Sequence, residues 1–173
     1  CEYDSVDVHS NGFRATVFSA EENGIVTAFN YNSVKLIDNI LETNFSALGI
    51  DLTMDKEGIL KVWDNEIMYY FSEKTGELLF TEGKDVEYVD LYSSAGIVKY
   101  HDVAQDREVY RLLKEDGTGF VEGVELPPLS MTNIIRLNDK IFFNTDEGCS
   151  MIYNSQGELL HDFGDKMKCT TVG

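Results

Sequence analysis

The repeating pattern that decides the fold is clearest in Ile67-Met-Tyr-Tyr-Phe-Ser-Glu-Lys-Thr-Gly76-Glu-Leu-Leu-Phe80. An aromatic run precedes a polar turn, the turn ends at a glycine, and a second apolar run follows. Tyr, Phe, Leu and Ile suit a half-buried pleated strand. Glycine supplies the positive φ that a tight hairpin turn requires. The stretch therefore predicts two antiparallel strands joined by a turn at Gly76.

The same pattern recurs along the chain. It reappears in Val109-Tyr-Arg-Leu-Leu-Lys-Glu-Asp-Gly117 and in Met151-Ile-Tyr-Asn-Ser-Gln-Gly157-Glu-Leu-Leu160, so the turn glycines are 41 and 40 residues apart. A degenerate copy is expected at Val34-Lys-Leu-Ile-Asp-Asn39-Ile-Leu41, with Asn39 in the turn because asparagine tolerates the left-handed conformation. A period of about 40 residues indicates a repeat architecture.

Short apolar runs between these turns predict further strands. Together with the hairpins they are Ala15–Phe18, Ile25–Phe29, Val34–Ile37, Ile59–Trp63, Ile67–Phe71, Glu77–Phe80, Val86–Leu91, Ile97–Tyr100, Val109–Leu113, Ile134–Leu137, Ile141–Phe143, Met151–Tyr153 and Glu158–Leu160. Ser33–Leu48 has the best helical periodicity, but the repeat favours strand–turn–strand there. We predict an all-β domain of antiparallel four-stranded units, approximately 13–50, 51–90, 91–130 and 131–173. Val86–Leu91 would close the second unit, and residues 1–12 would form a tether or edge strand.

The repeat resembles the blades of β-propeller proteins, particularly secreted bacterial ones. The resemblance lies in the Tyr/Phe-rich strand, the turn ending at Gly76, Gly117 or Gly157, and the Glu-Leu-Leu after two of these turns. Trp63-Asp64 has no preceding Gly-His, so the WD40 class is not indicated. The resemblance implies four blades or part of a larger ring. It also implies exposed loops that recognise protein, peptide or glycan.

The net negative charge of the chain limits the classes of partner that it is expected to bind. The chain has 14 Lys and Arg against 31 Asp and Glu, a net charge of −17. Phosphate backbones and anionic membranes attract clustered basic residues, so neither nucleic acid nor an anionic membrane surface is an expected partner. No apolar run has the length of a membrane span. A cationic ligand or Ca²⁺ is electrostatically compatible, although Ca²⁺ is only a weak cofactor candidate and no metal site is predicted.

The main candidate binding residues are acidic residues in hairpin turns. Pairs of carboxylates occur in three turns, at Asp55 and Glu57, Glu115 and Asp116, and Asp146 and Glu147. Each turn alone supplies too few ligands for Ca²⁺. In a ring of repeats, equivalent turns share one rim, which would form a negative belt for a cationic ligand.

Two histidines complete this set, because His101 and His161 each precede an aspartate. A His–carboxylate pair can orient a general base or hold a metal ligand. Adjacent strand residues point to opposite faces, however, and this favours exposed strand-end histidines. No catalytic residue is predicted, and a non-enzymatic role is favoured.

The cysteines bear on localisation. Cys149 and Cys169 can pair in an oxidising compartment or be small buried apolar residues, and without a Cys-x-x-Cys a zinc site is not expected. Cys1 with the polar stretch after it resembles a bacterial lipoprotein after signal cleavage, with Cys1 lipidated. A domain from a longer chain explains Cys1 equally well. An extracytoplasmic location, lipid-anchored or secreted, is favoured over a cytoplasmic one.

Three functions remain open from the sequence. The favoured one is a non-catalytic binding or scaffolding module. The alternatives are an acidic immunity-type inhibitor of a basic toxin or nuclease, and a propeller hydrolase or lyase with acids and histidines lining a channel. Pro127-Pro128 interrupts the strand pattern. It is expected to be a connector between units or, alternatively, a rigid binding loop.

Overall fold

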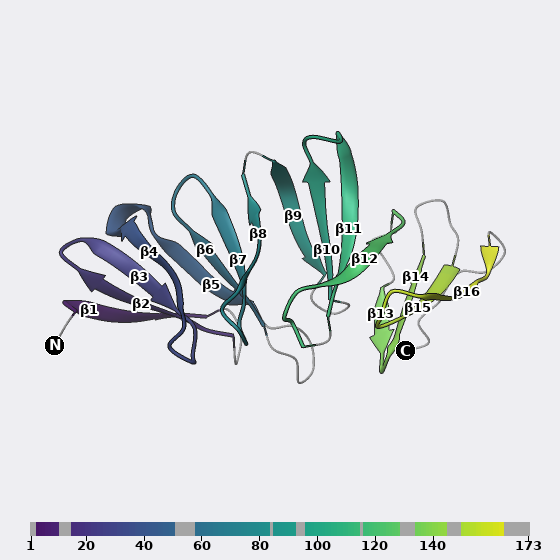
Figure 1. The fold of residues 1–173 in the computed structure, drawn as a ribbon, viewed down its shortest axis with the longest axis horizontal. Coiled ribbons are helices and arrows are strands. Elements are labelled where there is room, and N and C mark those ends of the chain that lie inside the picture. The colour runs from purple at the N-terminus through teal and green to yellow at the C-terminus, as the bar shows by residue number, and fades with distance from the viewer. Residues whose placement is uncertain are drawn as a thin grey trace. The chain divides into compact units, whose positions relative to one another are not determined.

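The computed structural model describes residues 3–10, 15–50, 58–83, 85–92, 96–114, 116–128, 134–144 and 150–164. Within these ranges the chain forms sixteen strands and one turn of 3₁₀ helix, η1 (Glu42–Asn44). The strands make four antiparallel sheets of four, and in each sheet the strands lie in sequence order (Figure 1). The predicted all-β fold of antiparallel four-stranded units is confirmed.

The sheets follow one another along the chain. The first contains β1 (Ser5–His9), β2 (Val17–Glu22), β3 (Ile25–Phe29) and β4 (Lys35–Leu41); the second contains β5 (Ser46–Ile50), β6 (Ile59–Trp63), β7 (Met68–Ser72) and β8 (Leu78–Glu82); the third contains β9 (Val86–Tyr92), β10 (Ile97–Asp102), β11 (Arg107–Leu113) and β12 (Phe120–Leu126); the fourth contains β13 (Ile135–Leu137), β14 (Lys140–Asn144), β15 (Ser150–Asn154) and β16 (Leu159–Asp162). The strand at Val86 therefore opens the third sheet and does not close the second.

The chain divides into two compact units. The first comprises Cys1–Glu87 with Asp116–Gly119, and the second comprises Tyr88–Glu115 with Phe120–Gly173. The core of the first unit joins its two sheets and consists of Ala15, Val17, Ala28, Ile40, Leu60, Val62 and Phe71. Burying each large aliphatic or aromatic side chain of this kind contributes roughly 1.5–3 kcal/mol. Apolar contact between successive sheets therefore holds this unit together.

The second unit repeats this construction. Its core contains Ile97, Tyr110, Leu112 and Leu126 of the third sheet with Ile141 and Phe143 of the fourth. Alternate residues of β11 point to opposite faces, so Tyr110 and Leu112 face the fourth sheet while Arg107, Val109 and Arg111 occupy the other face. That second face carries the first of the two depressions described below.

The turn glycines adopt the predicted conformation. Gly76, Gly117 and Gly157 have φ values of 73°, 67° and 78°. At Gly76 close packing also requires a glycine, because a Cβ there would lie 2.7 Å from Cγ1 of Val34, which immediately precedes β4 of the first sheet. The glycine thus permits both the turn and the close packing of the two sheets.

The expected hairpin at Asn39 is wrong. Asn39 does adopt a left-handed conformation, with φ 62°, but β4 runs through it from Lys35 to Leu41. The pairing of β3 with β4 shifts register on either side of Ala28. The left-handed residue therefore accommodates an irregularity in a continuous strand, and the chain reverses only after Leu41, at η1.

Four successive antiparallel sheets of this kind fit a propeller-like repeat fold. In the part of the chain that the structure describes, no helix is long and apolar enough to cross a membrane.

Candidate binding site

Two neighbouring depressions lie on the second unit. The first, of about 340 Å³, is lined by Tyr100, Asp102, Gln105, Arg107, Val109, Arg111, Gly123, Val124 and Glu125. The second, of about 720 Å³, is lined by Arg107, Glu108, Glu125, Leu126, Pro127, Pro128, Met151 and Tyr153. Arg107 and Glu125 line both, so this pair separates the two depressions.

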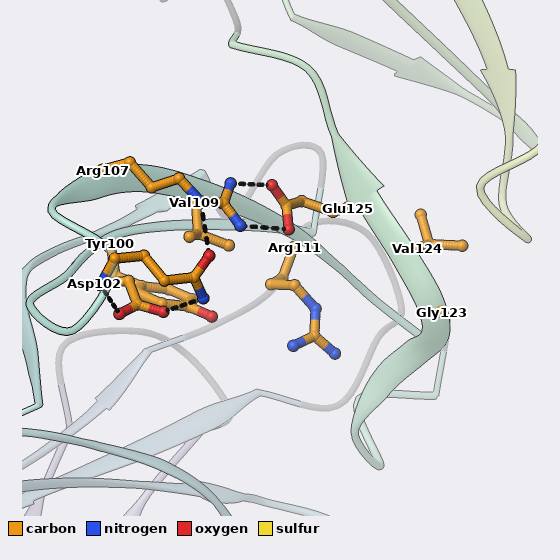
Figure 2. Close-up of a pocket in the computed structure, with 9 residues that line it drawn as sticks. Tyr100, Asp102, Arg107, Val109, Arg111, Gly123, Val124 and Glu125 are labelled. Atoms are coloured by element: carbon orange, nitrogen blue, oxygen red, sulfur yellow. Dashed lines mark hydrogen bonds and ion pairs between the residues drawn. The ribbon is translucent and has the colours of Figure 1, made fainter.

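A chain of hydrogen bonds crosses the first depression (Figure 2). The side-chain amide nitrogen of Gln105 donates to Oδ2 of Asp102 at 2.8 Å, and Nε of Arg107 donates to Oε1 of Gln105 at 2.9 Å. Both terminal nitrogens of Arg107 then donate to the two carboxylate oxygens of Glu125, with Nη2 to Oε2 at 3.1 Å. Such a bidentate pair fixes the planes of both groups.

This salt bridge favours the charged forms of both Arg107 and Glu125. The hydrogen bond from Arg107 lowers the pKa of the Glu125 carboxyl, and the hydrogen bond to Glu125 raises the pKa of Arg107. Both side chains are more than 40% exposed, so their salt bridge contributes little to the stability of the fold. Its main effect is to fix the positions of the two side chains between the depressions. Glu125 stays ionised and is already hydrogen-bonded when a ligand approaches.

Arg111 occupies a different position in the same depression. It is the cross-strand partner of Glu125 in the β11–β12 register, yet Glu125 turns to Arg107 (Figure 2). Cζ of Arg111 lies 4.6 Å from the ring centroid of Phe120, a cation–π contact. Among the described residues, none forms a hydrogen bond or salt bridge with its guanidinium. Its donors therefore face the depression.

The second depression combines an apolar lining with a charged rim. Met151 and Tyr153 come from β15, and Leu126 ends β12 and leads into Pro127 and Pro128. The Tyr153 ring stacks on Phe143 with centroids 5.1 Å apart, which anchors this side chain in the core. Proline rings restrict the backbone of the opposite wall. The hollow is consequently preformed on both sides.

The rim also holds a salt bridge. Nζ of Lys99 lies 2.5 Å from Oε1 of Glu108, and the Tyr110 hydroxyl donates to Oε2 of Glu108 at 3.0 Å. The hydrogen bond from Lys99 lowers the pKa of Glu108. Pro127 and Pro128, expected from the sequence to form a connector between units or a rigid binding loop, line this depression.

The two predicted histidines have separate surroundings. Nε2 of His101 lies 3.6 Å from Oδ1 of Asp106, and its ring meets that of Tyr88 edge-on. His161, on the edge strand β16, meets the ring of Phe163 edge-on. The structure brings neither histidine to its neighbouring aspartate, because Asp102 bonds Gln105 and Asp162 accepts from the amide of Gly164.

Most of the acidic residues and all of the cysteines singled out in the sequence lie outside the described residues. They are Asp55, Glu57, Glu115, Asp146, Glu147, Cys1, Cys149 and Cys169. Asp116 is described, and its Oδ1 accepts from the backbone amide and the hydroxyl of Thr118 at 3.1 and 2.7 Å. It therefore acts locally as a turn-stabilising residue. Within the described ranges, no group of three or more His, Cys, Asp or Glu side chains is placed to share a metal ion.

A histidine–serine pair lies in the first unit. Nε2 of His9 is 2.8 Å from Oγ of Ser19, and the His9 ring meets Phe45 at a centroid distance of 5.3 Å. Burial lowers the pKa of His9, and the charge of Asp7 opposes this effect. Neither depression includes these residues. The hydrogen bond satisfies the hydroxyl of a serine that is only 6% exposed.

Comparison with known proteins gives likenesses to several solved structures. The chain is similar to the crystal structure of BamB from Moraxella catarrhalis, with 16% sequence identity and a TM-score of 0.30 over 90% of this chain and 49% of that one. It thus spans about half the length of the protein it matches. No protein-family model matches the chain, and no curated protein is similar to it in sequence.

Proposed function

We propose that the chain is a non-catalytic binding module that takes an apolar side chain of a protein partner into the second depression. The observation that carries the proposal is the hollow between Pro127-Pro128 and the Met151–Tyr153 strand. Its volume falls within the range of about 300–1,000 Å³ found for ligand pockets. An apolar floor with a polar rim is also the usual construction of a protein interface.

Rigidity of the hollow supports the proposal. Binding costs free energy when loops and side chains must be ordered. Here Tyr153 is already stacked on Phe143, and the two prolines limit the motion of the other wall. A partner side chain therefore meets a surface that needs little rearrangement.

The charge of the molecule favours a basic partner. A net charge of −17 attracts cationic proteins over distances longer than the contact itself. At the rim, the carboxylates of Glu108 and Glu125 already bind Lys99 and Arg107, so the attraction for a basic partner comes from the net charge of the molecule. The favoured partner segment thus carries an apolar side chain next to a Lys or Arg, and added salt slows its association.

A random peptide library displayed on phage tests the proposal. We expect the immobilised protein to enrich peptides that pair a large apolar residue with a basic one. Met151→Gln should weaken binding of an enriched peptide by about tenfold or more, since a polar amide then faces the apolar group. Leu78→Gln, at a residue 52% exposed in the first unit, is the control and should bind as the unchanged protein does.

Binding is measured by fluorescence polarisation, and thermal unfolding verifies that each variant is folded. A folded Met151→Gln protein with unchanged affinity would rule out the second depression as the docking site. Enrichment of peptides without any apolar residue would contradict the proposed partner chemistry.

A further inference from the structure

Among the described residues, none forms a salt bridge with the Arg111 guanidinium in the first depression, whereas four other cations each have a carboxylate partner. Lys35, Lys99, Arg107 and Lys140 each form a salt bridge with a carboxylate, at Asp38, Glu108, Glu125 and Asp139 respectively. Arg111 lies in the middle of β11 and is partly buried, and its guanidinium lies over the ring of Phe120. A guanidinium carries five N–H donors in a fork that matches a carboxylate.

The neighbouring groups keep this fork available. Glu125 would be the nearest acceptor across the strands, but Arg107 binds both of its oxygens. Asp102 accepts from both the backbone and the side-chain amide of Gln105. A ligand carboxylate therefore reaches Arg111 without displacing an existing salt bridge.

We infer that the first depression is a carboxylate-binding subsite in which Arg111 forms a bidentate salt bridge with a carboxylate of the bound protein segment. The inference rests on the proposed function, because it supplies a second anchor point for the same partner. The carboxylate belongs to a chain terminus or to an Asp or Glu side chain.

The local charges set the selectivity of this subsite. Arg107 and Arg111 are balanced by Asp102 and Glu125 around the depression. A single negative charge can be accepted by Arg111, whereas the two carboxylates repel a second charge on the same ligand. The subsite should therefore prefer a carboxylate to phosphate, which carries more negative charge at neutral pH.

The test is an NMR titration that follows the Nε–Hε signals of the arginines and the methyl signal of Met151. The probes are N-acetylglycinate, with a terminal carboxylate; N-acetylaspartate 1-amide, with a side-chain carboxylate; N-acetylglycinamide, which is neutral; inorganic phosphate; and N-acetylleucinamide, which is neutral and apolar. We expect a saturable shift of the Arg111 signal with either carboxylate probe, and the tighter of the two identifies the source. The neutral probes and phosphate should leave this signal nearly unchanged.

Three variants give the matched controls. Arg111→Gln should weaken carboxylate binding by about tenfold or more, and Arg111→Lys should weaken it less, because it keeps the charge but loses the fork. Lys61→Gln removes another cation that lies over an aromatic ring, with Nζ 5.4 Å from the Tyr70 centroid in the first unit. Its affinity for the probes should match that of the unchanged protein.

Several results would overturn the inference. These are equal shifts with N-acetylglycinamide, tighter binding of phosphate, or unchanged carboxylate affinity in Arg111→Gln. The two proposals fail separately: the Met151 methyl responds to N-acetylleucinamide if the second depression binds apolar groups, whatever the Arg111 signal does.

Discussion

Gly157 packs directly against Val124, since a Cβ added to this glycine would lie 2.4 Å from Cγ1 of the valine. Val124 belongs to β12 of the third sheet, and Gly157 lies in the hairpin between β15 and β16 of the fourth. Gly76 and Val34 have the same relationship between the first and second sheets. The turn that identifies the repeat in the sequence is therefore also a point of contact between sheets.

Gly157→Ala should lower the free energy of unfolding by about 2–5 kcal/mol. Roughly 1–2 kcal/mol comes from the left-handed conformation, and about 1–3 kcal/mol from overpacking against Val124. Gly123→Ala is the control, because its φ is 69° but no atom lies within 4 Å of its Cβ position. Urea unfolding measures both. Equal losses in the two variants would show that contact with Val124 has no energetic weight.

Asn30→Ala should destabilise the first unit by about 2–4 kcal/mol. The Asn30 side chain is 1% exposed; its Nδ2 donates to the carbonyl of Glu73 at 3.0 Å, and its Oδ1 accepts from the amides of Asn32 and Val34. Leaving such buried groups without partners costs roughly 1–3 kcal/mol each.

Hydrogen exchange supplies the specific measurement for Asn30. The amides of Asn32 and Val34 should exchange faster in Asn30→Ala, while that of Leu60, in the core of the same unit, follows only the global change in stability. Asn30→Asp retains the acceptor and should protect the two amides better than alanine does. Similar exchange in both variants would contradict this role of Oδ1.

Acidification should weaken the first unit through His9. Burial holds the pKa of His9 below its ordinary value of about 6.5, so the unfolded chain takes up a proton first as the pH falls. Stability is therefore fully retained above about pH 6.5 and declines as the pH falls towards the folded-state pKa. The decline in melting temperature between pH 7.5 and 5.5 should be smaller in His9→Gln.

His161→Gln is the control for this pH experiment, because His161 is exposed on β16. It should show the same pH dependence as the unchanged protein. If His9→Gln also retained the full decline, protonation of His9 would not be its cause.

Tyr88→Asn should raise stability by about 1 kcal/mol. Tyr88 has φ 55° and is 76% exposed, so a bulky side chain occupies a conformation that favours glycine or asparagine. Tyr31→Asn is the control, at an exposed tyrosine outside the positive-φ residues. Urea unfolding should show the gain only at position 88. A loss there would mean that the edge-on contact with His101 outweighs the backbone strain.

The sequence could predict the strands that contain compact apolar runs. Ile25–Phe29 and Ile59–Trp63 were predicted with the bounds observed. Residues 1–12 were expected to form a tether or an edge strand, and Ser5–His9 is the edge strand of the first sheet. The strands at Ser46–Ile50 and Phe120–Leu126 were not predicted, because glycine or polar residues interrupt their apolar runs. Their places depend on pairing with neighbouring strands, which short-range apolar runs do not reveal.

The candidate site was harder to predict than the fold. Arg107 and Glu125 are 18 residues apart and come close because β11 and β12 are antiparallel neighbours. No motif marks such an encounter. Pro127-Pro128 was the one useful signal, since its break in the pattern pointed to a loop that lines the second depression.

Arg107 and Glu125 line both depressions, and this shared lining has a thermodynamic consequence. A ligand that tightens or loosens this pair from one depression changes the shape and charge of the other. Binding at the two depressions is then linked. If a carboxylate at Arg111 changes the affinity of the second depression for an apolar side chain by some factor, the apolar side chain changes the affinity for the carboxylate by the same factor. A partner offering both groups would thus be distinguished from one offering either alone by cooperativity, in addition to the sum of its contacts.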